Sequence, residues 1–68
     1  MVFDMGKWTT GTKRVAGKTY RVIKRGGAWL IMQGGKLIAM FVKGVIYTFS
    51  REVGRHLARR VFAARVAA

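Results

Sequence analysis

Acidic residues are almost missing from this sequence. Asp4 and Glu52 stand against 14 Lys or Arg, so the formal net charge is +12 on 68 residues. There is also no Cys, which excludes a disulfide framework, a zinc finger and a thiol nucleophile. Two distant carboxylates and one His leave little for acid–base catalysis. We therefore expect one small domain that is not an enzyme and holds no metal and no cofactor.

Long apolar runs are missing as well. Residues 28–49 are the most apolar stretch, but Gln33-Gly34-Gly35-Lys36 and Lys43-Gly44 interrupt it, and a spanning helix needs roughly 20 apolar residues. The first ten residues lack the apolar centre of a signal peptide. With the absence of Cys, this favours a cytoplasmic or nucleoid-associated protein. The hydrophobic fraction of 51% excludes a disordered basic tail.

Glycines divide the middle of the chain into short segments of five to seven residues that are rich in β-branched and aromatic residues. The dividing glycines are Gly17, Gly26-Gly27, Gly34-Gly35 and Gly44. Short β-rich segments joined by two-residue glycine turns predict successive hairpins. We expect an antiparallel β-meander of three to five strands, the earliest around residues 12–15. Residues 1–11 are interpreted as an N-terminal arm and residues 12–68 as the domain.

The pattern becomes helical after Phe49. Ser50 is a suitable N-cap, Glu52 would lie in the first turn, and no Pro follows. The apolar face would consist of Val53, Leu57, Val61 and Ala64. Arg51, Arg55 and Arg59 recur every four residues on the opposite face, as a phosphate-contacting row or simply a solvated face. The fold class is therefore α+β, with a C-terminal helix on one side of the sheet; a small SH3-like barrel with a terminal helix is the alternative.

The segment 37–42 is apolar on both faces, whereas one helix can cover only one. Either the sheet curls and closes on itself, or the second face is a self-association surface. A homodimer could use this apolar sheet face, or Phe62 and Val66, which lie near the basic side of the predicted helix.

The charge indicates an anionic partner, and nucleic acid is the commonest polyanion in cells. We expect a nucleic-acid-binding protein, with DNA favoured over RNA. The predicted phosphate contacts are Lys18, Arg21, Lys24, Arg25, Arg51, Arg55 and Arg59, with Lys36 and Lys43 more peripheral. Trp29 is the candidate for stacking on a base, with core packing as its alternative.

Two other partners stay open. The protein could inhibit or adapt an acidic protein, because carboxylates also pair with Arg. It could also be a membrane-active cationic protein that lies on an anionic lipid surface.

Part of the chain resembles the DNA-binding domains of the AP2 and integrase N-terminal type, which have a three-stranded sheet and a helix. The resemblance rests on Tyr20-Arg21-Val22, Gly27-Ala28-Trp29, Ile46–Ser50 and Ala58–Ala64. It departs in an additional strand and in a helix without the family's usual acidic residue and Ala pair. It implies that the sheet enters the major groove, with Arg21, Lys24 and Arg25 reading DNA. Small basic proteins of this kind are also common in phages.

Overall fold

The structure is a computed structural model and describes residues 5–67 of the chain. A 3₁₀ turn, η1 (Met5–Lys7), comes first. The strands are β1 (Gly11–Val15), β2 (Lys18–Arg25), β3 (Ala28–Gln33), β4 (Lys36–Val42) and β5 (Val45–Thr48), and the helix is α1 (Arg55–Ala63).

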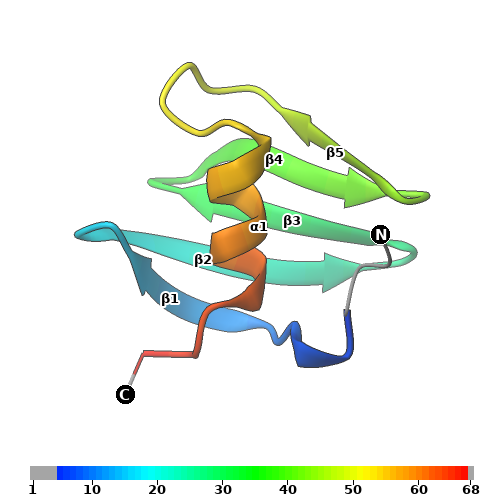
Figure 1. Ribbon diagram of the computed structural model, residues 1–68, viewed down its shortest axis with the longest axis horizontal. Coiled ribbons are helices and arrows are strands. Elements are labelled where there is room, and N and C mark those ends of the chain that lie inside the picture. Colours follow the sequence, from blue (N-terminus) through cyan, green and yellow to red (C-terminus); the bar gives the residue numbers. More distant parts are fainter. Residues whose placement is uncertain (1–4, 68) are drawn as a thin grey trace.

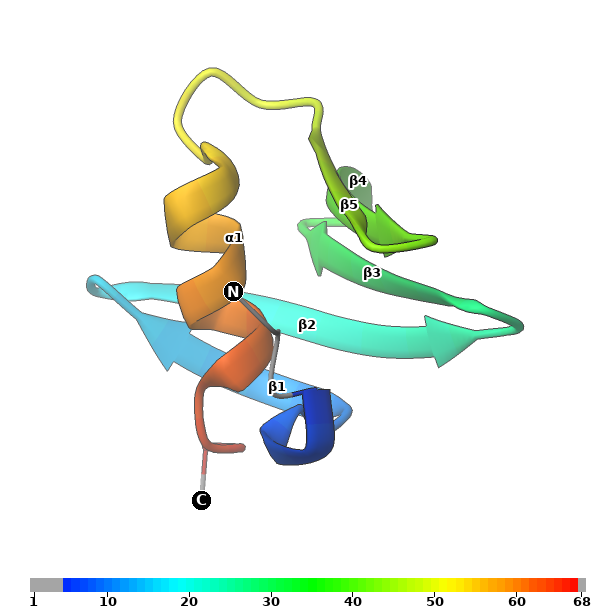
Figure 2. The same cartoon turned by 45° about the vertical axis from the view of Figure 1, so that its right-hand side comes forward.

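The five strands form one antiparallel sheet in the order β1-β2-β3-β4-β5. Helix α1 lies across one face of this sheet (Figure 1). The turned view in Figure 2 shows the helix standing in front of a twisted, open sheet. The α+β meander with a C-terminal helix is thereby confirmed, including the strand before Ala16-Gly17. The barrel alternative is wrong, because the first and last strands do not pair.

Two-residue turns join neighbouring strands, as the glycine pattern predicts. Gly34 and Gly35 both have positive φ, 59° and 79°. Two successive residues of this kind suit the right-handed twist of a hairpin. At the next turn Lys43 adopts φ 50° ahead of Gly44 at 82°, so a residue with a Cβ accepts the left-handed region there. The meander therefore follows from local turn chemistry.

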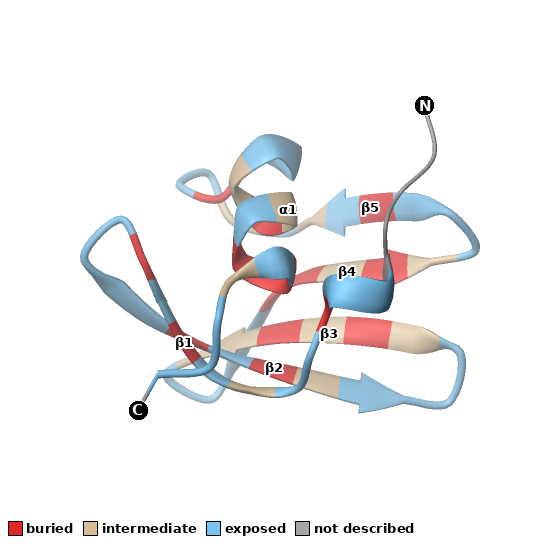
Figure 3. Ribbon diagram, turned by 60° about the horizontal axis from the view of Figure 1, so that its bottom comes forward, coloured by how far each residue is buried: buried red, intermediate tan, exposed pale blue. Residues whose placement is uncertain are grey.

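Trp8 lies at the centre of the core and is only 8% exposed. Its ring stacks on that of Phe62, with centroids 4.6 Å apart and 16° between the planes. Trp29 and Phe41 meet it edge-on, at 5.6 and 5.0 Å. Figure 3 shows the buried positions running through the strands beneath α1. The cluster thus joins the N-terminal segment, the sheet and the helix.

This packing corrects the N-terminal arm expected for residues 1–11. The chain before β1 carries a core residue and includes η1, so from residue 5 onward it belongs to the domain. Trp8 gave no periodic signal because a single aromatic residue outside a strand or helix has no period. Residues 1–4 lie outside the described part of the chain.

The helix begins at Arg55, later than the predicted cap at Ser50. The Ser50 hydroxyl instead accepts a hydrogen bond from the backbone N–H of Glu52, at 3.2 Å, and so closes a local turn. Val53, 2% exposed, enters the core before the helix starts. Gly54 is the true N-cap, with extended backbone (φ −83°, ψ 177°) and no side-chain cap. The chain must first cross from β5 to the covered face of the sheet, and the helix begins only after this connection.

The later start also changes which residues face the sheet. Ala58, Val61 and Phe62 are buried, while Leu57 and Ala64 pack partly against the core. Phe62 is 0% exposed, so its predicted role as a dimer contact is wrong. Val66 stays 47% exposed, but it lies beside β1, where a Cβ on Gly11 would come within 3.0 Å of its methyl carbons.

Replacing Trp8 tests whether the N-terminal segment belongs to the core. We expect Trp8→Ala to lower the free energy of unfolding by about 3–5 kcal/mol, because it removes the ring that three other aromatic rings contact. Thr9→Ala is the control, since the neighbouring Thr9 is exposed, and it should change stability by less than about 0.5 kcal/mol. Chemical denaturation measures both. Equal changes in stability for the two variants would support the original interpretation of this segment as an N-terminal arm outside the core.

Replacing Gly54 tests the corrected start of the helix. The backbone is extended here and a Cβ would meet no neighbouring atom within 4 Å, so Ser fits without strain. A Ser hydroxyl at this position can accept from an unpaired N–H of the first turn. We expect Gly54→Ser to be more stable than Gly54→Ala by about 1 kcal/mol in thermal or chemical unfolding. If the two variants are equally stable, Gly54 is not the N-cap.

Candidate functional site

The sheet separates the basic side chains of β2 from those of α1. Tyr20 and Val22, each 1% exposed, turn toward the helix. Side chains alternate along a strand, so Arg21 and Arg25 point to the opposite, helix-free face, called the outer face below. The surface predicted from strand and helix arginines together is therefore divided between two sides of the molecule.

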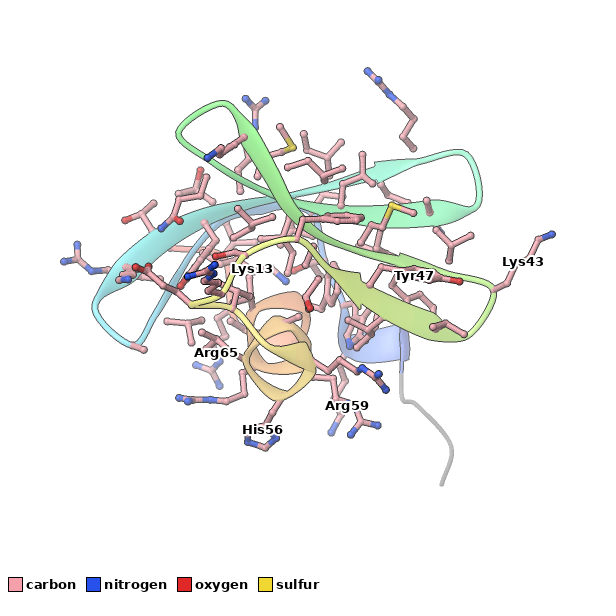
Figure 4. The ribbon with its side chains drawn as sticks, turned by 90° about the horizontal axis from the view of Figure 1, so that it is seen from above. Lys13, Lys43, Tyr47, His56, Arg59 and Arg65 are labelled. Carbon is pink, nitrogen blue, oxygen red and sulfur yellow. The ribbon has the colours of Figure 1, made fainter. Side chains whose placement is uncertain are left out.

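A hollow of about 470 Å³ lies between β5 and α1. It is lined by Gly44, Val45 and Ile46 on one side and by Arg55, His56 and Arg59 on the other, and is called the basic pocket. Figure 4 shows His56 and Arg59 on the helix side of the sheet, while Lys43 extends away from the β4–β5 turn. Arg55 and Arg59 are four residues apart and so lie on the same side of α1. Two guanidinium groups and an imidazole thus border one volume, with no acid among its described lining residues.

Arg51 does not belong to this group. It precedes α1, so the predicted row of three helical arginines reduces to Arg55 and Arg59. Arg51 instead borders a separate, smaller hollow together with Lys36 and the exposed ring of Phe49. The helix start decides this, because four-residue spacing aligns side chains only within a helix.

Several of the predicted phosphate contacts make interactions within the protein, and Lys18 and Lys24 are two of them. The ammonium of Lys18 lies 2.9 Å from a carboxylate oxygen of Glu52. This hydrogen bond, with the opposite charge, raises the pKa of Lys18 and lowers the pKa of Glu52. The Lys24 ammonium lies 5.2 Å from the ring centre of Trp29, a cation–π contact.

Trp29 itself packs in the core. It is 8% exposed and meets Trp8 and Phe62 edge-on. Of the two roles predicted for Trp29, the structure therefore supports core packing. Little of its ring is exposed for a base to stack on. The three residues that the AP2-type resemblance assigns to DNA reading are likewise separated: Arg21 and Arg25 lie on the outer face, and Lys24 on the helix side.

Lys13 is a buried basic residue that is absent from the contacts predicted above. It is 0% exposed, and its ammonium donates a hydrogen bond to the backbone carbonyl of Phe62. That carbonyl belongs to the last turn of α1, where carbonyls lack helical partners and a cation suits the helix dipole. Burial lowers the pKa of the Lys13 ammonium. The sequence did offer one signal for this burial. Lys13 is two residues from Val15 in β1, so both side chains point to the same, covered face of the sheet.

Other classes of site gain no support from the structure. Within residues 5–67, no three His, Asp or Glu side chains gather as metal ligands would. The described helix is also too short and too polar to cross a bilayer.

Comparisons with protein-family models, with characterised proteins and with solved structures find no match to this chain. The functional assignment therefore depends on the charge and geometry of the surfaces described above.

Lys13 gives the protein a distinct dependence of stability on pH. Its pKa is lower in the folded state than the ordinary 10.5, so the unfolded chain binds more protons between the two values. The free energy of unfolding should therefore rise as the pH increases through this interval. Lys13→Met removes this contribution and fills a similar volume.

The measurement is chemical denaturation of both proteins from neutral pH to about pH 10. We expect the stability of the unsubstituted protein, relative to Lys13→Met, to increase with pH. The other lysines are common to both proteins, so their titration cancels in the comparison. A pH-independent difference would mean that the ammonium is not desolvated.

Proposed function

We propose that this protein binds nucleic acid without chemical turnover, and that the basic pocket holds backbone phosphate. The observation that carries the proposal is the convergence of Arg55, His56 and Arg59 on one hollow beside β5. Arginine pairs with phosphate through two parallel hydrogen bonds, and imidazole nitrogens can add another. The pocket thus offers several donors to one anionic group.

The overall charge supports the same conclusion. A net charge of +12 on a compact chain produces self-repulsion that a polyanion relieves. Binding also releases the counterions condensed on the nucleic acid, which favours association at low salt. We propose DNA before RNA as the ligand.

A double charge reversal tests the pocket. We expect Arg55→Glu/Arg59→Glu to weaken binding to a short mixed-sequence DNA duplex by about tenfold or more, because two phosphate donors become repulsive. The slope of log affinity against log salt should become shallower by about two. Fluorescence anisotropy over a salt series measures both quantities. Single-stranded DNA and duplex RNA of equal length establish the preferred ligand.

The matched control is Arg21→Glu/Arg25→Glu, which changes the net charge equally on the outer face. It should retain most of the affinity. Equal losses in the two double variants would mean that only total charge matters. A larger loss in the control would move the interface to the outer face, as the AP2-type resemblance implies.

An acidic protein is the second candidate partner, because carboxylates could occupy the basic pocket as phosphates would. Binding to DNA no tighter than to heparin at near-physiological salt would favour this inhibitor or adaptor role. Capture of one acidic protein that depends on Arg55 and Arg59 would support it directly.

A further inference from the structure

The outer face of the sheet is apolar over most of its area. Strand pairing places Ile23 opposite Leu30, Leu30 opposite Met40, and Met40 opposite Tyr47. These four side chains form a continuous row across β2, β3, β4 and β5, and Figure 4 shows Tyr47 beside β5, at one end of it. We call this row, with its neighbours Met32 and Val42, the outer apolar patch.

The neighbouring rows are uncharged from β3 to β5. One runs from Met32 to Leu37, and the other from Ala28 through Val42 to Val45. The two rows begin in β2 with Arg21 and Arg25, respectively. Positive charge on the described outer face of β2–β5 is thus confined to one edge.

Large apolar side chains stay exposed at the β4–β5 end of the sheet, while Ile23, Leu30, Met32, Met40 and Val42 are half-buried. Among the described residues, four of the five large apolar side chains that stay exposed belong to β4, β5 or the residue after β5. They are Leu37 at 37%, Val45 at 45%, Tyr47 at 46% and Phe49 at 58%. Contiguous apolar surface of this kind marks an interaction site more often than isolated exposed residues do.

We propose that a second copy of this chain covers the outer apolar patch, forming a face-to-face dimer. A two-fold axis parallel to the strands would place β5 of each copy over β2 of the other. The Tyr47 rings would then lie near the partner copy's Arg21 and Arg25, where cation–π contacts are available. The alternative axis, perpendicular to the strands, would place arginine over arginine.

The absence of charge from β3 to β5 favours a second copy over an acidic protein. Carboxylates of an acidic partner would lose water against Leu30, Met40 and Val42 without gaining a cation there. Single-stranded bases would find only one aromatic ring, Tyr47, in the central row, whereas sheets that bind them use several. A second copy brings no carboxylate against these apolar residues and needs no aromatic ring besides Tyr47.

The area of the patch sets the strength of the dimer. Strands about 4.8 Å apart with about six residues each give a sheet face of roughly 400 Å². Side chains stand out of this plane, so two copies would bury about 1,000 Å² of accessible surface, the lower end for specific association. Each copy carries +12, and this repulsion weakens the pairing further. The dimer is therefore weak and reversible, and salt strengthens it by screening.

Such a dimer would place the two copies of α1 on opposite outsides. Sheets packed about 10 Å apart, each with a helix about 10 Å from it, put the helix axes about 30 Å apart. Both basic pockets would then face outward. If the proposed phosphate binding holds, one dimer can bridge two nucleic-acid segments; the dimer itself does not depend on that function.

The test is sedimentation equilibrium of the protein alone, from low to high micromolar concentration, at low and high salt. We expect the mean mass to rise from 7.6 kDa toward twice that value with concentration, and to do so more readily at high salt. Met40→Lys places a charge in the centre of the patch and should weaken association by about tenfold or more. Thr19→Lys adds the same charge to the outer face beyond the patch and should change association little.

A second variant guards against loss of folding. Tyr47 lies on the edge strand, where a substitution disturbs the sheet less than one in a central strand does. We expect Tyr47→Lys to weaken the dimer as well, and to remain folded, as a cooperative unfolding transition would show. A mass that stays at 7.6 kDa at the highest concentration and salt overturns the proposal, as does equal association of Met40→Lys and Thr19→Lys. The sedimentation experiment contains no nucleic acid. Failure to detect a dimer would therefore leave the proposed phosphate binding by Arg55 and Arg59 untouched. Binding of nucleic acid weakens with salt, whereas dimerisation strengthens.

Discussion

The stack of Trp8 on Phe62 holds the two ends of the chain together over the sheet. Its rings lie 4.6 Å apart and nearly parallel, and Trp29 and Phe41 meet Trp8 edge-on from β3 and β4. In a domain of this size a single core must supply nearly all the stability. The stack decides where α1 sits, and the position of α1 decides which arginines border β5 and which face of the sheet stays uncovered.

Scarcity of acids shapes the electrostatics of the fold. Glu52 pairs with Lys18, and the Lys13 ammonium donates to a carbonyl in the last turn of α1. The helix dipole and a carbonyl without a helical partner thus take the part that a carboxylate has in most proteins. The remaining cations gather on the helix side around Arg55 and Arg59, on the β1–β2 edge, and at the turns. The fold therefore presents its charge as separate surfaces with different neighbours.

These surfaces suit different partners. The basic pocket is a hollow whose helix side carries the hydrogen-bond donors Arg55, His56 and Arg59, which suits an oxyanion. The outer apolar patch is a sheet face without charge from β3 to β5, which suits another apolar sheet face. A helix on one face of a five-stranded sheet leaves the other face uncovered, so the two surfaces necessarily lie on opposite sides. Salt should affect the two surfaces in opposite directions. Screening weakens the attraction of the basic pocket for an anion, and it reduces the repulsion between two copies that pair through the outer apolar patch.

Local sequence features determined the meander. Each turn between strands contains a glycine with positive φ, which favours a two-residue hairpin, and the strand segments carry β-branched and aromatic residues. The two-sided apolar character of residues 37–42 also predicted apolar side chains on both faces of the sheet, and β4 carries them on both faces. These features are decided by neighbours in the sequence, so they can be read without coordinates.

Only the tertiary structure decided the helix start, the burial of Trp8 and Lys13, and the division of the basic residues. Val53 enters the core before α1 begins, which removes Arg51 from the helical row and turns Phe62 inward. Lys13 is buried because β1 passes beneath the C-terminal turn of α1, a contact between residues 49 positions apart. Such contacts depend on how far the connecting loop must travel to bring the helix onto the sheet, and no local pattern in the sequence encodes that distance.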